Sequence, residues 1–163
     1  MAELTNLEDK LGEVVGLAMA AQGAADKVIK LVDDEGLSKT LTRMKAEAAQ
    51  AEERGTQLAG SLDGKKTAIL DKAREVKAKA EKMMSTYLDD DADGLDGFEF
   101  LTMAEAGEVG HWKVLEQMSQ GSGNMQAAEL ARWGIPIQER HLQEVQAACL
   151  QLAAEEDPNE PAE

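Results

Sequence analysis

The chain has 163 residues, enough for one domain with a hydrophobic core. Only 3% of the residues are aromatic and three are proline, so the composition predicts an almost entirely helical protein and argues against a substantial sheet. The formal net charge of −15 argues against binding nucleic acid or an anionic membrane through a broad surface, and it favours cations or a basic protein partner.

The cysteine content and the apolar pattern indicate where the protein works. Cys149 is the only cysteine, so an internal disulfide and a Cys-rich zinc module are excluded and a reducing, cytoplasmic location is predicted. Residues 1–9 lack a basic region followed by an apolar run, so we expect no signal peptide. No run of about 18 apolar residues occurs, so we also expect no membrane partner.

Three amphipathic helices are predicted in the first half of the chain. The first covers residues 4–32 up to a turn at 33–36, the second begins at Ser38 and ends before a turn at 63–64, and the third covers 66–87. Apolar or small residues alternate three and four positions apart, which is the repeat of a helical bundle. These positions are Leu4, Leu7, Leu11, Val14, Ala18, Ala21, Ala25, Val28 and Val32; then Leu41, Met44, Ala48, Ala51, Gly55, Leu58 and Leu62; then Ile69, Ala73, Val76, Ala80, Met83 and Tyr87.

An acidic stretch at 89–97 follows and begins like a calcium-binding loop. Asp89, Asp91 and Asp93 match positions one, three and five of an EF-hand, but Glu99 comes one residue early for the closing bidentate ligand. The favoured interpretation is a solvated loop between helices, and calcium binding is the weaker alternative.

The fourth predicted helix, 98–118, places two polar residues where apolar ones are expected. Its inward positions are Leu101, Ala104, Glu108, His111, Leu115 and Met118. Residues three apart share one face of a helix, so Glu108 and His111 could offer a carboxylate oxygen and a ring nitrogen to one metal ion, with Glu105 as a neighbour. The alternatives are a buried Glu–His hydrogen bond, or a helix rotated so that both groups reach solvent.

The last part of the chain is predicted as a short helix and a long one. The short segment 125–133 ends at a Gly-Ile-Pro break at 134–136, and the long helix covers 137–155. We therefore expect one domain over 1–156 and a flexible acidic tail at 157–163.

His141 in the last helix is the second candidate for the metal site. Glu139, His141 and Glu144 could complete a site if this helix packs against the helix of Glu108. The apolar seam runs through Gln138 and Leu142, so His141 is expected to flank the seam; without a metal it would be a partly exposed surface residue.

Over residues 98–155 the chain resembles the YciE/YciF-type bacterial stress-protein family of the ferritin-like superfamily. The resemblance is carried by 103–112 (Met-Ala-Glu-Ala-Gly-Glu-Val-Gly-His-Trp), by 127–130 and by 138–141. It implies an all-α, ferritin-like four-helix bundle with a short fifth helix, frequent homodimers and a di-iron centre.

The sequence departs from that family where a di-iron centre needs its ligands. The first helix offers Ala21 and Gln22 where a glutamate is expected, and Leu142 breaks the Glu-x-x-His pattern that begins at Glu139. The prediction is therefore a mononuclear site, a degenerate di-iron site or none, with iron or zinc as the metal and Glu105, Glu108, His111, Glu139, His141 and Glu144 as candidate ligands.

Two functions follow from these patterns. The first is a non-enzymatic, stress-associated metal-binding bundle, and the alternative is a structural or interaction protein without metal. An enzyme, which would be a di-iron oxidase-like one, is the weakest interpretation because carboxylates are missing. Continuous apolar seams predict a homodimer through helical faces.

Overall fold

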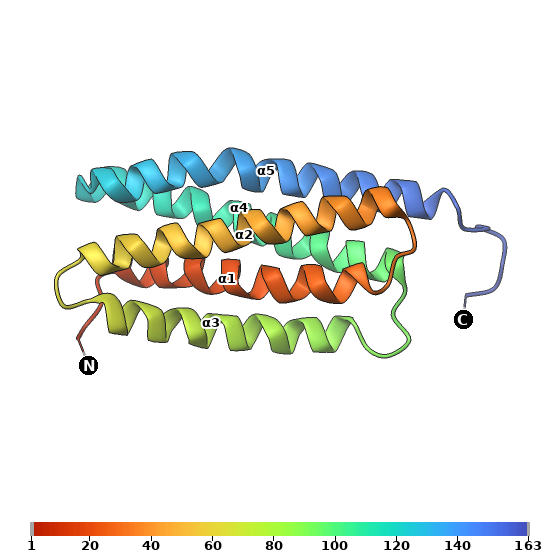
Figure 1. Ribbon diagram of the computed structural model, residues 1–163, viewed down its shortest axis with the longest axis horizontal. Helices are drawn as coiled ribbons and strands as arrows, with labels where there is room; N and C mark the ends of the chain where they lie inside the picture. Colours follow the sequence, from red (N-terminus) through yellow and green to blue (C-terminus); the bar gives the residue numbers. More distant parts are fainter. Residues whose placement is uncertain (1, 163) are drawn as a thin grey trace.

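The computed structural model describes residues 2–162, and this part of the chain is all-helical (Figure 1). It contains five helices and no strand, which confirms the predicted all-α class. The helices are α1 (Asn6–Ile29), α2 (Glu35–Ser61), α3 (Lys66–Tyr87), α4 (Gly94–Ser122) and α5 (Met125–Ala153).

Polar residues in the turns fix where the helices begin. The Asp34 carboxylate accepts a hydrogen bond from Leu37 N, so α2 begins at Glu35, three residues before the predicted start. Asp93 and Asp96 form a capping box at the start of α4. The predicted acidic loop at 89–97 is therefore wrong in its second half, because its aspartates begin a helix.

The predicted break at 134–136 is also wrong. Helix α5 continues through Pro136 to Ala153, so the fifth helix is long and not short. Gly134 is buried against Trp112 of α4, where an added Cβ would lie 2.5 Å from the indole ring. The glycine thus allows close helix packing, and packing along α4 outweighs the hydrogen bond that proline removes.

Each helix runs antiparallel to the one before it (Figure 1). Helix α1 packs against α2, α3 and α4, while α4 packs along α5, and α5 also contacts α2. Helix α3 lies on the outer side of α1 and has little contact with α4. The described chain is thus a helical bundle with α1 at its centre.

The apolar core is divided into two clusters along the bundle. One contains Leu11, Val15, Ile69, Trp112, Leu115 and Leu130, and the other contains Val28, Leu41, Met44, Phe98, Leu101 and Val145. Between these clusters lie the buried polar side chains of Glu105 and Glu108 in α4 and of Gln138 and His141 in α5, together with the partly buried Glu47 of α2.

The prediction for α3 holds only for its first half. Ile69 and Ala73 are buried, but Met83 and Tyr87 are 51% and 59% exposed. The reason is that the second half of α3 lacks a covering helix. Across residues 2–162, none of the helices combines the length and the apolar content that crossing a membrane requires.

Candidate functional site

A layer of polar side chains lies in the middle of the bundle, between the two apolar clusters. Glu105 and Glu108 come from α4, Gln138 and His141 come from α5, and all four are buried. Glu47 of α2 joins them with 13% of its side chain exposed. In α4 and α5 the two polar residues are three positions apart, so each pair shares one helix face.

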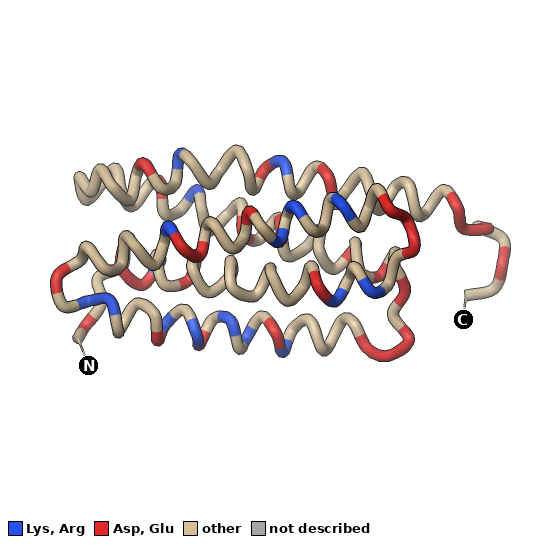
Figure 2. Tube along the Cα trace, in the orientation of Figure 1, with Lys and Arg blue, Asp and Glu red and all other residues tan. Residues whose placement is uncertain are grey.

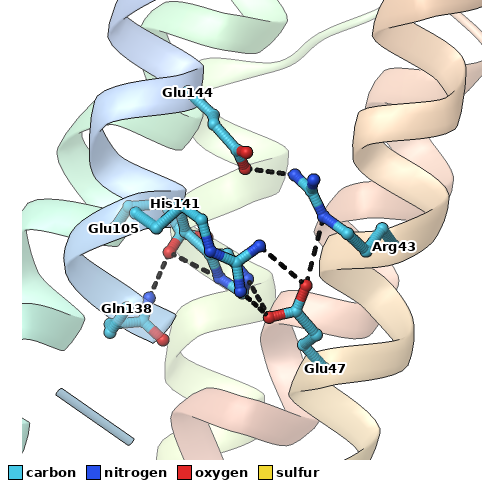
Figure 3. Close-up of polar contacts among 7 residues, drawn as sticks. Arg43, Glu47, Glu105, Gln138, His141 and Glu144 are labelled. Carbon is cyan, nitrogen blue, oxygen red and sulfur yellow. Dashed lines mark hydrogen bonds and ion pairs between the residues drawn. The ribbon is translucent and has the colours of Figure 1, made fainter. Parts of the chain in front are cut away.

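His141 is at the centre of this layer, between two carboxylates (Figure 3). Its Nδ1 lies 3.5 Å from Glu105 Oε2, and its Nε2 lies 3.5 Å from Glu47 Oε2. Gln138 Nε2 donates a hydrogen bond to the same oxygen of Glu105. Buried as it is, His141 Nε2 has no hydrogen-bond partner within residues 2–162.

Glu47 is held by basic side chains. Arg140 donates hydrogen bonds to both of its carboxylate oxygens. Arg43 Nε lies 3.1 Å from one of them (Figure 3). Burial acts to raise the pKa of Glu47, but the Arg140 hydrogen bond and the nearby charges of His141, Arg140 and Arg43 outweigh it and lower the pKa. Glu47 is therefore ionised at neutral pH.

Glu108, unlike Glu47, is buried without a basic partner in the described part of the chain. It is 5% exposed, and no hydrogen bond or ion pair reaches its carboxyl group from residues 2–162. Burial, and secondarily the charge of Glu105, raise the pKa of Glu108 well above the ordinary value. A cation beside Glu108 would reverse this effect and favour the carboxylate.

A small cavity lies beside His141 within the polar layer. Its volume is about 10 Å³, and its polar lining comes from Glu47, Glu108, Gln138 and His141. Trp112 supplies part of the apolar wall. A space of this size is close to the lower limit for one water molecule.

The prediction that His111 faces the core is wrong. Its side chain is 40% exposed, with Nδ1 3.1 Å from Glu13 Oε2 and 3.1 Å from Lys10 Nζ. The buried stripe of α4 runs through Leu101, Glu105, Glu108, Trp112, Leu115 and Ser119. An α-helix has 3.6 residues per turn, so a buried stripe with alternating spacings of three and four residues can begin with either spacing. After Leu101 the prediction begins with a spacing of three, whereas the structure begins with a spacing of four.

The candidates on α5 are also arranged differently from the prediction. His141 was expected to flank the core, but it is 3% exposed. Glu139 lies on the surface, where its carboxylate is 2.8 Å from Lys113 Nζ, and Glu144 pairs with Arg43 of α2. The structure therefore brings Glu105, Glu108 and His141 together and leaves out His111, Glu139 and Glu144.

Sequence reasoning missed Glu47 and Gln138. The spacing of Gln138 and His141 was an available signal, because both lie on one face of a helix. Glu47 gave a weaker signal, since it precedes the seam residue Ala48 by one position.

The residues present do not fit a dinuclear iron centre. Such a centre needs carboxylates from two helices and Glu-x-x-His from two others, whereas His141 is the only buried histidine in residues 2–162. On α1, Gln22 occupies a position where a glutamate is expected, and it donates a hydrogen bond to Glu52 of α2. Within the same range, no three His, Cys, Asp or Glu side chains lie together in a geometry that could hold a metal ion.

In the acidic turn before α4, two aspartate carboxylates accept hydrogen bonds from backbone N–H groups close to them in the sequence. Asp89 Oδ1 accepts a hydrogen bond from Asp91 N, and Asp93 Oδ1 accepts one from Asp96 N. Both are typical interactions of turns and helix starts.

No model of a known protein family matches the chain, and a search of curated proteins finds no match.

Proposed function

We propose that the protein is a non-enzymatic, ferritin-like helical-bundle protein that binds one divalent transition metal ion at His141. The resemblance at 98–155 extends this proposal to a bacterial stress-associated role, a cytoplasmic location and a homodimer. Helices α1 and α5 run in one direction and α2 and α4 in the other, and α3 connects the α1–α2 hairpin to the α4–α5 hairpin; this order of directions is consistent with a ferritin-like arrangement.

The single observation that supports the metal proposal is the state of the His141 ring. One nitrogen faces the Glu105 carboxylate, and the other is buried beside a small polar cavity without a hydrogen-bond partner. Histidines that bind metals typically direct their second ring nitrogen to a carboxylate, which fixes the ring and raises its basicity. Glu105 would play that supporting part here.

The remaining donors would be Glu47 and Glu108, whose side chains line the same cavity as His141. One imidazole nitrogen and two carboxylates suit zinc or ferrous iron better than calcium, which prefers oxygen ligands alone. Binding requires Glu47 and Glu108 to close on the ring nitrogen. A cation would favour that movement because it offsets the cost of ionising buried Glu108.

A second candidate function is a structural or interaction bundle without metal. The observation in its favour is that Glu47 and Glu105 already have protein partners: Arg140 and Arg43 for the first, Gln138 for the second. In this case the polar layer would fix the relative positions of α2, α4 and α5.

Metal titration of the full chain separates the two candidates. Calorimetry with Zn²⁺ or anaerobic Fe²⁺ should show one equivalent bound by the unmodified chain and by His111→Ala, which removes the exposed histidine. His141→Ala should abolish that stoichiometric binding, and Glu105→Gln should weaken it about 10–100-fold, as loss of an outer carboxylate typically does.

The proposal would be wrong if the unmodified chain bound no equivalent, or if His141→Ala bound as well as His111→Ala while both stayed folded. In the structural case no metal is bound by any of them, and His141→Ala changes the stability alone.

A further inference from the structure

An apolar groove lies between α1, α3 and α4, where the second half of α3 is not covered by α4. Its volume is about 380 Å³, within the range of about 300–1,000 Å³ that small-molecule sites occupy. The walls include Leu17, Val76, Met83, Met84, Phe100 and Met103. Methionine side chains are flexible and adapt to ligands of different shape.

Glu105 and Glu108 are the only acids in the deep part of this lining; Glu81, the third, is on α3 at the rim. Glu105 is already engaged by Gln138 and His141. Glu108 is only 5% exposed, and within residues 2–162 its carboxyl group makes no hydrogen bond or ion pair. An apolar groove thus contains one buried carboxyl group that lacks a partner.

We propose that the groove binds an apolar molecule with a primary amine head group, whose nitrogen donates to Glu108 while its hydrocarbon part lies against the methionine-rich wall. The site differs from the metal proposal in its ligand and in its apolar walls. It shares Glu108, whose carboxylate has two oxygens, and it is also lined by Glu105, which would support His141 in the metal proposal. Binding of the amine does not require a metal.

The charges around the groove favour an amine over a fatty acid. Lys79 already donates to Glu75, and His111 is held near Glu13 and Lys10, so both basic lining residues have partners. A carboxylate head would instead face Glu105 and Glu108 in a chain of net charge −15. A neutral alcohol would fit the walls but would lack the charge-assisted hydrogen bond.

Head-group selectivity tests this proposal directly. The full chain, kept in EDTA, is titrated by calorimetry with decylamine and decanoate below their micelle concentrations and with decanol below its solubility limit. We expect decylamine to bind one-to-one and about tenfold or more tighter than the other two, because hydrogen bonds to charged groups are stronger than neutral ones. Glu108→Gln should remove this preference, whereas Glu99→Gln, an exposed acid on the same helix, should keep it.

A second pair of variants tests the groove itself. Ala80→Phe places a large side chain into the lining and should abolish binding of all three ligands, while Ala78→Phe on the exposed face of α3 should not. His141→Ala should still bind decylamine, which keeps this proposal distinguishable from the metal proposal.

Four results would overturn the proposal. Equal affinity for decylamine and decanol, or an unchanged preference in folded Glu108→Gln, would rule out the head-group assignment. Absence of binding to the folded chain, whether it is a monomer or a dimer, would rule out the ligand site. A dimer in sedimentation that Ala80→Phe converts to a monomer would show that a second copy covers the groove.

Discussion

Glu108 is an acid that is buried in the folded chain, and this burial raises its pKa. An acid whose pKa is raised in the folded state keeps its proton at a pH where the unfolded chain has lost it. The stability that it contributes is therefore complete below about pH 4.5, the ordinary value, and is lost as the pH rises toward the raised pKa.

Replacing Glu108 with glutamine should remove this dependence. We expect Glu108→Gln to be more stable than the unmodified chain by about 1–3 kcal/mol at about pH 8, and the difference to shrink toward about pH 5. Urea unfolding in EDTA at several pH values measures it, with Glu99→Gln as the exposed control. If the two chains differed in their free energy of unfolding by the same amount at every pH in this range, the assignment of Glu108 as a neutral buried acid would be contradicted.

The residue-scale predictions from sequence were right for some positions and wrong for others. Glu108 was correctly placed in the core, since an acid in an apolar seam is a strong signal. His111 was predicted inside the core and His141 at its edge, but His111 is partly exposed and His141 is buried. A shift of one residue in the buried stripe of α4 is enough to turn His111 outward. Only the packing of α4 against α5 and α1 determines that stripe.

At the scale of helices, the contact between α4 and α5 depends on Gly134. Its absent side chain leaves room for the indole of Trp112, which is 2% exposed. Gly110 of α4 provides a matched control, because an added Cβ there would meet nothing within 4 Å.

Alanine at these two glycines should have opposite effects. Gly134→Ala should destabilise the protein by about 1–3 kcal/mol, because the methyl group displaces the ring of Trp112. Gly110→Ala should stabilise it by about 0.5–1 kcal/mol through the lower flexibility of the unfolded chain. Chemical unfolding followed by circular dichroism measures both. Similar values for the two variants would show that α4 and α5 do not depend on this contact.

Helix positions were largely predictable from the apolar repeat, and their ends were less so. The seams of α1 and α2 are confirmed, since Leu11, Val14, Leu41 and Met44 are all buried. The helix break expected at 134–136 does not occur, because packing of α5 along α4 outweighs the low helix propensity of glycine and proline. The exposed end of α3 could not be predicted, since a repeat does not reveal whether a neighbouring helix covers it.

For the whole molecule, charge is the dominant surface property. Acidic residues occur on every helix and make up much of the connection between α3 and α4, while basic residues alternate with acidic ones along α3 (Figure 2). With a net charge of −15, repulsion should outweigh the exposed ion pairs, which contribute little individually.

Salt should therefore stabilise the protein. Between low ionic strength and about 0.5 M NaCl we expect the Tm to rise by about 2–4 °C, because salt screens repulsion between exposed charges. The same series near pH 4.5, the isoelectric point, should show a much smaller rise. A Tm that falls with salt at neutral pH would mean that attractive pairs dominate the surface.

The most direct test of the central proposal is anomalous diffraction from crystals of the full chain grown with Zn²⁺. We predict one anomalous peak within about 2.0–2.1 Å of His141 Nε2, with oxygens of Glu47 and Glu108 completing the protein ligands. A peak beside His111 and Glu13 alone, or no peak at His141 in crystals that contain zinc elsewhere, would contradict it.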